Sequence, residues 1–159
     1  MNDLSASPIG STAESDDIHM GYMGRGEIID SLNELIEAER AGTRTALALR
    51  GAETRQDIRD FVRGFHAEET HWCTQLIEAV RRLGGAPSER CGDTYEKTMA
   101  ISDPVDRLAF TVRGQRWLER KLDCLLPVIR DETLQAMLRT IRDGHRHNQG
   151  RIRQLVTPR

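Results

Sequence analysis

Four helical segments of this 159-residue chain each carry an ionisable residue at the centre of an otherwise apolar stripe. At about 100° per residue, Glu39, Glu69, Glu119 and His145 project onto the same faces as the leucines, isoleucines and valines of their segments. Moving an ionised carboxylate out of water costs several kcal/mol, and three converging carboxylates also repel one another. The pattern therefore predicts a helical protein whose core holds a compensating group, such as a cation.

The apolar periodicity predicts an all-α fold of four long helices. The predicted spans are 26–50, 57–83, 104–126 and 131–156. Asp103 before Pro104 is a strong helix start, and Asp131 can cap the last helix. Only the connection over residues 86–102 is long. Two antiparallel helical hairpins joined by a long crossover are therefore expected, as opposed to a bundle with three short loops.

The length and the 38% hydrophobic content suit one domain with a single core. We assign this domain to residues 25–157. Residues 1–24 are rich in serine, glycine, aspartate and methionine, and they have little periodic hydrophobicity. The sequence therefore predicts that they form a flexible N-terminal tail.

Charge and cysteine content narrow the class of protein. The net charge is −2, with both signs interspersed, and the arginines of the last helix accompany no nucleic-acid motif. We therefore expect no nucleic-acid partner.

No apolar run approaches the roughly 18 residues of a membrane span, so no membrane partner is expected. The three cysteines lack a paired spacing, which favours a reducing cytoplasm over a disulfide framework or a thiolate zinc site.

The four polar positions lie in segments that resemble the ferritin-like superfamily, of the rubrerythrin and bacterioferritin type. The segments are LIEAERAG around Glu39, HAEETHW around Glu69, GQRWLERKL around Glu119 and DGHRHNQ around His145. The superfamily pattern is a glutamate on each of two helices and Glu-x-x-His on each of the other two. The chain also resembles uncharacterised bacterial families of that superfamily with similar EAERAG, LGG and MAI elements. The likeness covers about residues 28–156 and implies a ferritin-like four-helix bundle without an established activity.

The chain departs from the superfamily pattern at two places. Trp72 stands three residues after Glu69, where the pattern has histidine, and Arg142 stands three residues before His145, where it has glutamate. The literal match of Glu68 with His71 is rotated, so that His71 points away from the apolar stripe. The resemblance therefore implies a degenerate metal motif with fewer ligands.

We expect iron or manganese to bind through Glu39, Glu69, Glu119 and His145, with oxygen-linked or peroxide-linked oxidoreductase chemistry as the possible activity. The alternative is a metal-free helical scaffold with a hydrogen-bonded polar core. A second apolar stripe, formed by Phe110, Trp117 and Cys124, lies opposite Glu119. Either the 86–102 crossover covers this stripe, or two chains meet there as a homodimer.

Overall fold

The computed structural model describes residues 10–158, and every regular element in that range is helical. The elements are α1 (Gly10–His19), α2 (Arg25–Arg50), α3 (Gln56–Arg82), α4 (Thr94–Met99), α5 (Pro104–Leu125), the 3-10 turn η1 (Leu126–Val128) and α6 (Glu132–Val156). The four long helices confirm the predicted spans to within one or two residues at most ends. None of the described helices combines the length and apolarity that a bilayer span requires.

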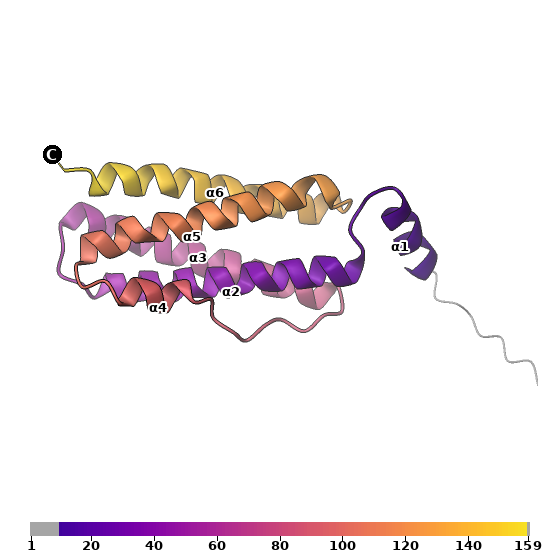
Figure 1. Cartoon of the computed structure of the whole chain (residues 1–159), viewed down its shortest axis with the longest axis horizontal. Coiled ribbons are helices and arrows are strands. Elements are labelled where there is room, and N and C mark those ends of the chain that lie inside the picture. Colours follow the sequence, from indigo (N-terminus) through magenta and orange to yellow (C-terminus); the bar gives the residue numbers. More distant parts are fainter. Residues whose placement is uncertain (1–9, 159) are drawn as a thin grey trace, which may run out of the picture.

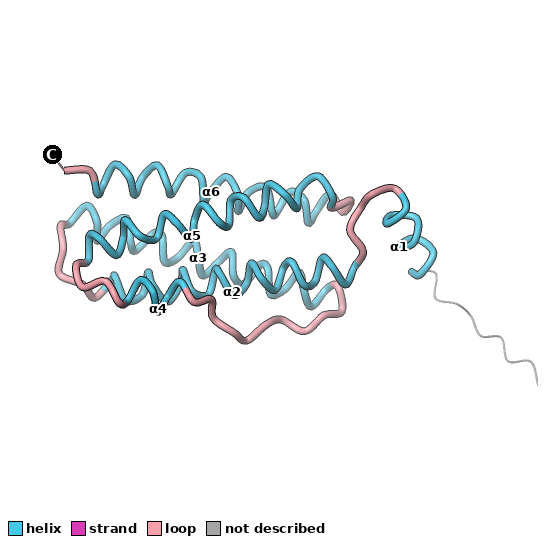
Figure 2. Tube along the Cα trace, viewed as in Figure 1, coloured by secondary structure: helices cyan, strands magenta, loops and turns pink. Residues whose placement is uncertain are grey.

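The four long helices lie side by side as two antiparallel pairs (Figure 1). α2 packs along α3, and α5 packs along α6. The pairs meet where α2 contacts α5 and α3 contacts α6. Figure 2 shows the long connection between the pairs, which runs along the outside of α2 and includes the short helix α4. α4 packs against both α2 and α5, so the crossover closes the seam between the two pairs.

Local signals in the sequence account for several helix ends. The Asp103 carboxylate accepts hydrogen bonds from the N–H groups of Val105 and Asp106, both at 2.9 Å, at the start of α5. Asp131 accepts from Leu134 N–H at 2.7 Å in the same way at the start of α6. Both caps confirm the predicted helix starts.

The end of α3 is a Schellman turn built on two glycines. Gly84 has a φ of +80°, a conformation that glycine adopts without the steric cost of a Cβ. Its N–H donates to the carbonyl of Arg81, and the N–H of Gly85 donates to the carbonyl of Val80, both at 2.9 Å. The turn therefore satisfies the last carbonyls of α3 and directs the chain into the crossover.

The core consists of two apolar clusters with a polar layer between them. One cluster contains Leu32, Leu76, Leu122 and Leu138, among others. The other contains Leu49, Val62, Leu108 and Ile152, among others. On each long helix the buried polar residue lies between the stretches that contribute to the two clusters, so the polar side chains occur at one level. The buried polar residues of this level are Glu39, Glu69, Gln115, His145 and Asn148.

The structure adds two short helices to the predicted four. α1 falls inside the predicted tail of residues 1–24, of which residues 1–9 lie outside the described range. The Glu14 carboxylate accepts a hydrogen bond from Arg25 N–H at 2.8 Å, and Asp17 forms an ion pair with Arg130. These polar contacts, rather than an apolar stripe, connect α1 to the first residue of α2 and to the loop before α6. Hydrophobic periodicity therefore did not reveal α1.

Candidate metal centre

Three helices bring Glu39, Glu69 and His145 together in the middle of the core. Glu39 comes from α2, Glu69 from α3 and His145 from α6, and all three side chains are completely buried. Each offers a ligand atom within 4.8 Å of the other two. Such a group of two carboxylates and one imidazole can hold a metal ion. We call these three residues the EEH cluster.

A glutamine from α5 connects both ends of the EEH cluster. Gln115 donates a hydrogen bond from its side-chain Nε2 to Glu69 Oε1 at 2.8 Å, and its Oε1 lies 2.6 Å from His145 Nδ1. Because an amide oxygen can only accept, Nδ1 carries the ring proton when the imidazole is neutral. His145 Nε2 then accepts a hydrogen bond from the protonated carboxyl of Glu39, whose Oε1 lies 2.6 Å away, and becomes available to a metal when Glu39 loses that proton. Gln115 therefore selects the tautomer that leaves Nε2 available as a ligand.

Two carboxylate oxygens of the EEH cluster have no nitrogen or hydroxyl donor among the described residues, and the contact between the two carboxyl groups is their remaining interaction. These are Glu39 Oε2 and Glu69 Oε2, and both atoms are fully buried. A buried oxygen without a donor costs free energy, and most buried polar atoms in proteins have a partner. A cation held by the cluster would compensate the charge of both carboxylates.

Burial changes the acidity of all three groups. It raises the pKa of Glu39 to about 7, although a hydrogen bond with Glu69 offsets part of the effect. The pKa of Glu69 lies well above its ordinary value because of burial and, next, the neighbouring charge of Glu39. Burial lowers the pKa of His145 and so favours a neutral ring. Without a cation the cluster therefore retains protons near neutral pH, and a bound divalent ion would replace them.

A glycine of α2 provides the space for the Glu69 carboxylate. A Cβ atom at Gly42 would lie 2.4 Å from Glu69 Oε2, closer than van der Waals contact permits. Glycine in the middle of a helix normally destabilises it by about 0.5–1 kcal/mol relative to alanine. The absence of a side chain at position 42 therefore has a structural reason, which is the position of this carboxylate.

A second glycine provides space for Trp72. A Cβ atom at Gly144 would lie 2.3 Å from Cζ2 of the Trp72 indole. The indole meets the His145 ring edge to face, with 4.7 Å between the centroids. Trp72 is also buried. It therefore closes the cluster on one side and restricts rotation of the imidazole.

Replacing Gly144 by alanine is expected to destabilise the protein by about 1–3 kcal/mol, since the new methyl group forces the buried indole to move. Chemical denaturation followed by circular dichroism measures this loss. Gly150→Ala is the matched control, because a Cβ there meets no atom within 4 Å and lies on the same helix. Equal stability of the two variants would show that Trp72 is not packed against Gly144.

The structure does not bring Glu119, the fourth predicted ligand, into the EEH cluster. Its side chain is 20% exposed and accepts hydrogen bonds from Arg146 at 2.7 Å and Gln149 at 2.5 Å. These contacts lower the pKa of Glu119, against the opposing effect of burial. The apolar face of α5 includes Leu118 and Leu125, whereas the sequence projection centred the face on Glu119. Glu119 therefore lies at the edge of that face, beside α6, and Gln115 enters the core.

The other side chains considered from the sequence surround the cluster or face solvent. Asn148 is buried and donates a hydrogen bond to Glu68 at 3.0 Å, while His71 is exposed, as its rotation predicted. In the stripe on α5, Trp117 remains 45% exposed and Cys124 is exposed. Phe110 is half-buried beside α4, with which it lines a pocket. The crossover therefore covers one end of the stripe.

Sequence projection did not assign a role to Gly42 or Gly144. The only signal for the glycines was their occurrence inside predicted helices, where glycine is unfavourable. Such a glycine indicates close packing, but the sequence does not show which side chain approaches it. Only the tertiary structure identifies Glu69 and Trp72 as the neighbours.

Comparison with known proteins finds one family model, and its match contains this centre. A family model described as "Domain of unknown function (DUF6306)" matches residues 26–154. No curated protein and no solved structure matches the chain. The matched range includes the whole EEH cluster, Gln115 and both glycines that make room for it.

Proposed function

This chain belongs to the DUF6306 family, whose function is unknown, and we propose from its core that it binds one divalent iron or manganese ion. Glu39, Glu69 and His145 are the protein ligands. The two carboxylates neutralise the charge of the ion, and the imidazole supplies a nitrogen ligand. Water or a substrate occupies the remaining coordination positions.

The observation that carries this proposal is the convergence of two buried carboxyl groups and one imidazole, whose Nε2 lies 2.6 Å from Glu39 Oε1, in a space where two carboxylate oxygens have no nitrogen or hydroxyl donor. Metal-bound histidines usually donate their second N–H to an acceptor, which fixes the tautomer. The Gln115 side-chain oxygen takes that place beside His145 Nδ1. Apart from the contact between the two carboxyl groups, neither Oε2 atom has a donor, which leaves both available to a cation.

The chemistry of the ligands supports the choice of metal. Carboxylates and an imidazole, without a thiolate, suit iron(II) and manganese(II). Trp72 lies beside His145, where the ferritin-like pattern would bring a second histidine, and this favours one ion over two. Both metals change oxidation state readily, so we propose oxygen-linked or peroxide-linked oxidoreductase chemistry for the loaded protein. Consumption of peroxide by the manganese-loaded chain tests this activity.

The arrangement of the helices supports a ferritin-like four-helix bundle as the fold that carries this site. α2 with α3 and α5 with α6 form two hairpins, and the long connection through α4 joins them (Figure 1). Bundles of this connectivity build metal sites from inward side chains of facing helices. The EEH cluster occupies the corresponding position, at mid-height in the core.

The proposal predicts the metal content of three proteins. After anaerobic incubation with ferrous or manganous ion and removal of free metal, elemental analysis is expected to find about one equivalent in the wild type. Glu69→Gln and Glu119→Gln each convert a carboxylate into an amide of the same shape. The Glu69 variant is expected to lose the metal, whereas the Glu119 variant retains it because Glu119 lies outside the cluster.

Two results would contradict the site. Wild-type protein without metal under these conditions would leave the metal-free polar core as the correct interpretation. Loss of metal in Glu119→Gln but not in Glu69→Gln would place the site elsewhere. Circular dichroism of each variant shows whether the helices are intact.

A further inference from the structure

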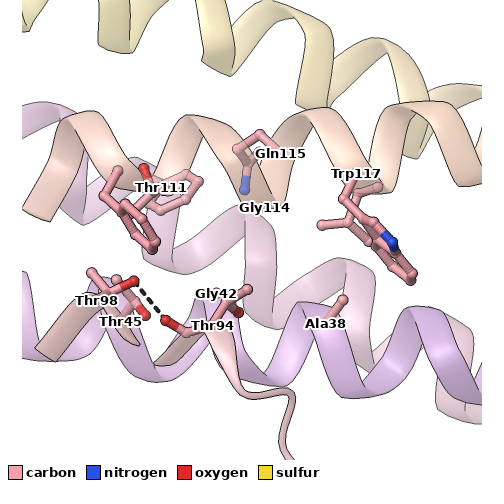
Figure 3. A pocket seen from close by; sticks show the side chains of 12 residues that line it. Ala38, Gly42, Thr45, Thr94, Thr98, Thr111, Gly114, Gln115 and Trp117 are labelled. Carbon is pink, nitrogen blue, oxygen red and sulfur yellow. Dashed lines mark hydrogen bonds between the residues drawn. The ribbon is translucent and has the colours of Figure 1, made fainter. Parts of the chain in front are cut away.

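A depression between α2, α4 and α5 extends from the surface toward the EEH cluster. Its inner part is a cavity of about 60 Å³, and its outer part is an open groove of about 650 Å³. The cavity and the groove are continuous, because five residues line both of them. These residues are Ala38, Thr94, Phe110, Gly114 and Trp117. Figure 3 shows the inner part, with Trp117 on α5 extending toward α2.

The inner end of the depression reaches the two residues that hold the Glu69 carboxylate. Gly42 and Gln115 both line the cavity. Gly42 is the residue whose missing side chain makes room for Glu69 Oε2, and Gln115 donates to Glu69 Oε1. Figure 3 labels Gln115 on α5 and Gly42 on α2 among the lining residues. A molecule in the cavity would therefore be separated from Glu69 only by the Gly42 backbone and the Gln115 amide.

The walls of the inner cavity favour an apolar occupant. Phe65, Phe110, Leu118 and small side chains form most of the lining. The hydroxyl of Thr98 donates to the Thr94 carbonyl at 2.6 Å, so this donor is already engaged. A cavity of about 60 Å³ exceeds the roughly 10–15 Å³ that one water requires. It can therefore accept a short hydrocarbon chain.

The outer groove leaves one cation available to an anionic group. Its other charged side chains have partners: Glu34 with Lys121 at 2.6 Å, Glu37 with Arg90 at 3.1 Å, and Lys97 with Asp93 at 2.9 Å. Arg113 makes no ion pair with any carboxylate in the described part of the chain. Its guanidinium lies 5.4 Å from the centroid of the Phe110 ring. Arg113 thus presents a positive charge beside the entrance to the apolar cavity.

We propose that this depression binds a small organic carboxylate with a short apolar chain. The carboxylate group of the ligand pairs with Arg113 at the surface. The apolar chain of the ligand extends inward between Phe110 and Gly114, toward Gly42 and Gln115. The role of this ligand as a substrate or effector of the metal centre rests on the proposed function. The binding of the ligand to the depression does not depend on the metal. The binding is therefore measured first on the metal-free protein.

The test uses pentanoate as the probe and 1-pentanol as its uncharged counterpart. Titration is followed through the amide NMR signals of Gly42 and Gly114. Gly114→Leu is expected to weaken pentanoate binding at least about tenfold, because a Cβ at Gly114 meets no atom within 4 Å and the added side chain enters the groove. Gly150→Leu is the matched control, with the same change at an open position on α6.

Arg113→Gln tests the anionic group separately. It is expected to weaken pentanoate binding at least about fivefold and to leave 1-pentanol binding unchanged, since only the carboxylate meets the guanidinium. Arg120→Gln, at an exposed position of the same helix, serves as its control.

Three outcomes would overturn the proposal. They are no pentanoate binding by the wild type, equal binding by Gly114→Leu, and equal pentanoate affinity in Arg113→Gln. Self-association that disappears in Gly114→Leu would instead assign the groove to a second copy of the chain. Repeating the titration after manganese loading separates the two hypotheses. Binding of pentanoate without binding of manganese would contradict only the metal centre. Binding of manganese without binding of pentanoate would contradict only the proposed ligand pocket.

Discussion

Replacing Gly42 by alanine is expected to lower the affinity for manganese by about 100-fold, the upper range for loss of support around a metal ligand. The new Cβ would lie 2.4 Å from Glu69 Oε2, so the carboxylate must rotate away from His145 and Glu39. The surrounding core is closely packed and offers no equivalent position. Isothermal titration calorimetry under anaerobic conditions measures the affinity.

The control for this substitution is Gly64→Ala on α3, where a Cβ meets no atom within 4 Å. Both changes improve helix propensity by up to about 1 kcal/mol, so a purely local effect would stabilise both proteins equally. Unchanged manganese affinity in Gly42→Ala would show that the Glu69 carboxylate is not a ligand in the observed position. Reduced affinity in both variants would indicate a general effect on the helices.

Metal-free protein is expected to become less stable as the pH rises from about 6.5 through about 7, where the folded-state pKa of Glu39 lies. The pKa of Glu39 is about 7 in the folded state against 4.5 as its ordinary value, and that of Glu69 is also raised. Between these values the folded chain keeps protons that the unfolded chain releases, so rising pH favours unfolding. For Glu39 alone the full effect is on the order of 3 kcal/mol.

His145 opposes this trend only at lower pH. Its pKa in the folded chain lies below the ordinary value of 6.5. Acidification therefore protonates His145 in the unfolded chain first, which lowers the free energy of unfolding below about pH 6.5. Above about pH 6.5 the carboxyls therefore determine the slope. Urea unfolding at several pH values measures it, with Glu69→Gln as the control that lacks one titrating group but keeps its shape.

Saturating manganese is expected to reverse the pH trend, because the metal binds the deprotonated ligands and its affinity rises with pH. A wild type whose stability does not fall between about pH 6.5 and 8, or falls no more steeply than that of Glu69→Gln, would show that the carboxyls do not keep protons in the folded state.

The sequence by itself determined the helices and three of the inward polar groups. Apolar spacing and the caps at Asp103 and Asp131 are local signals, so they located the helices closely. Glu39, Glu69 and His145 lie at the centres of broad apolar stripes. Small errors in the orientation of a helix leave such positions buried, and these predictions were therefore insensitive to packing.

Tertiary structure alone decided which side chain of α5 enters the polar layer. Gln115 and Glu119 lie on adjacent turns, and the apolar residues around them are compatible with either orientation. Packing of Leu118 and Leu125 into the core orients α5, and Arg146 on α6 then pairs with Glu119 at the edge. The glycines that accommodate Glu69 and Trp72, and the depression closed by α4, depend on contacts between distant segments. Periodicity within one helix contains no information about such contacts, because they arise only when the helices pack.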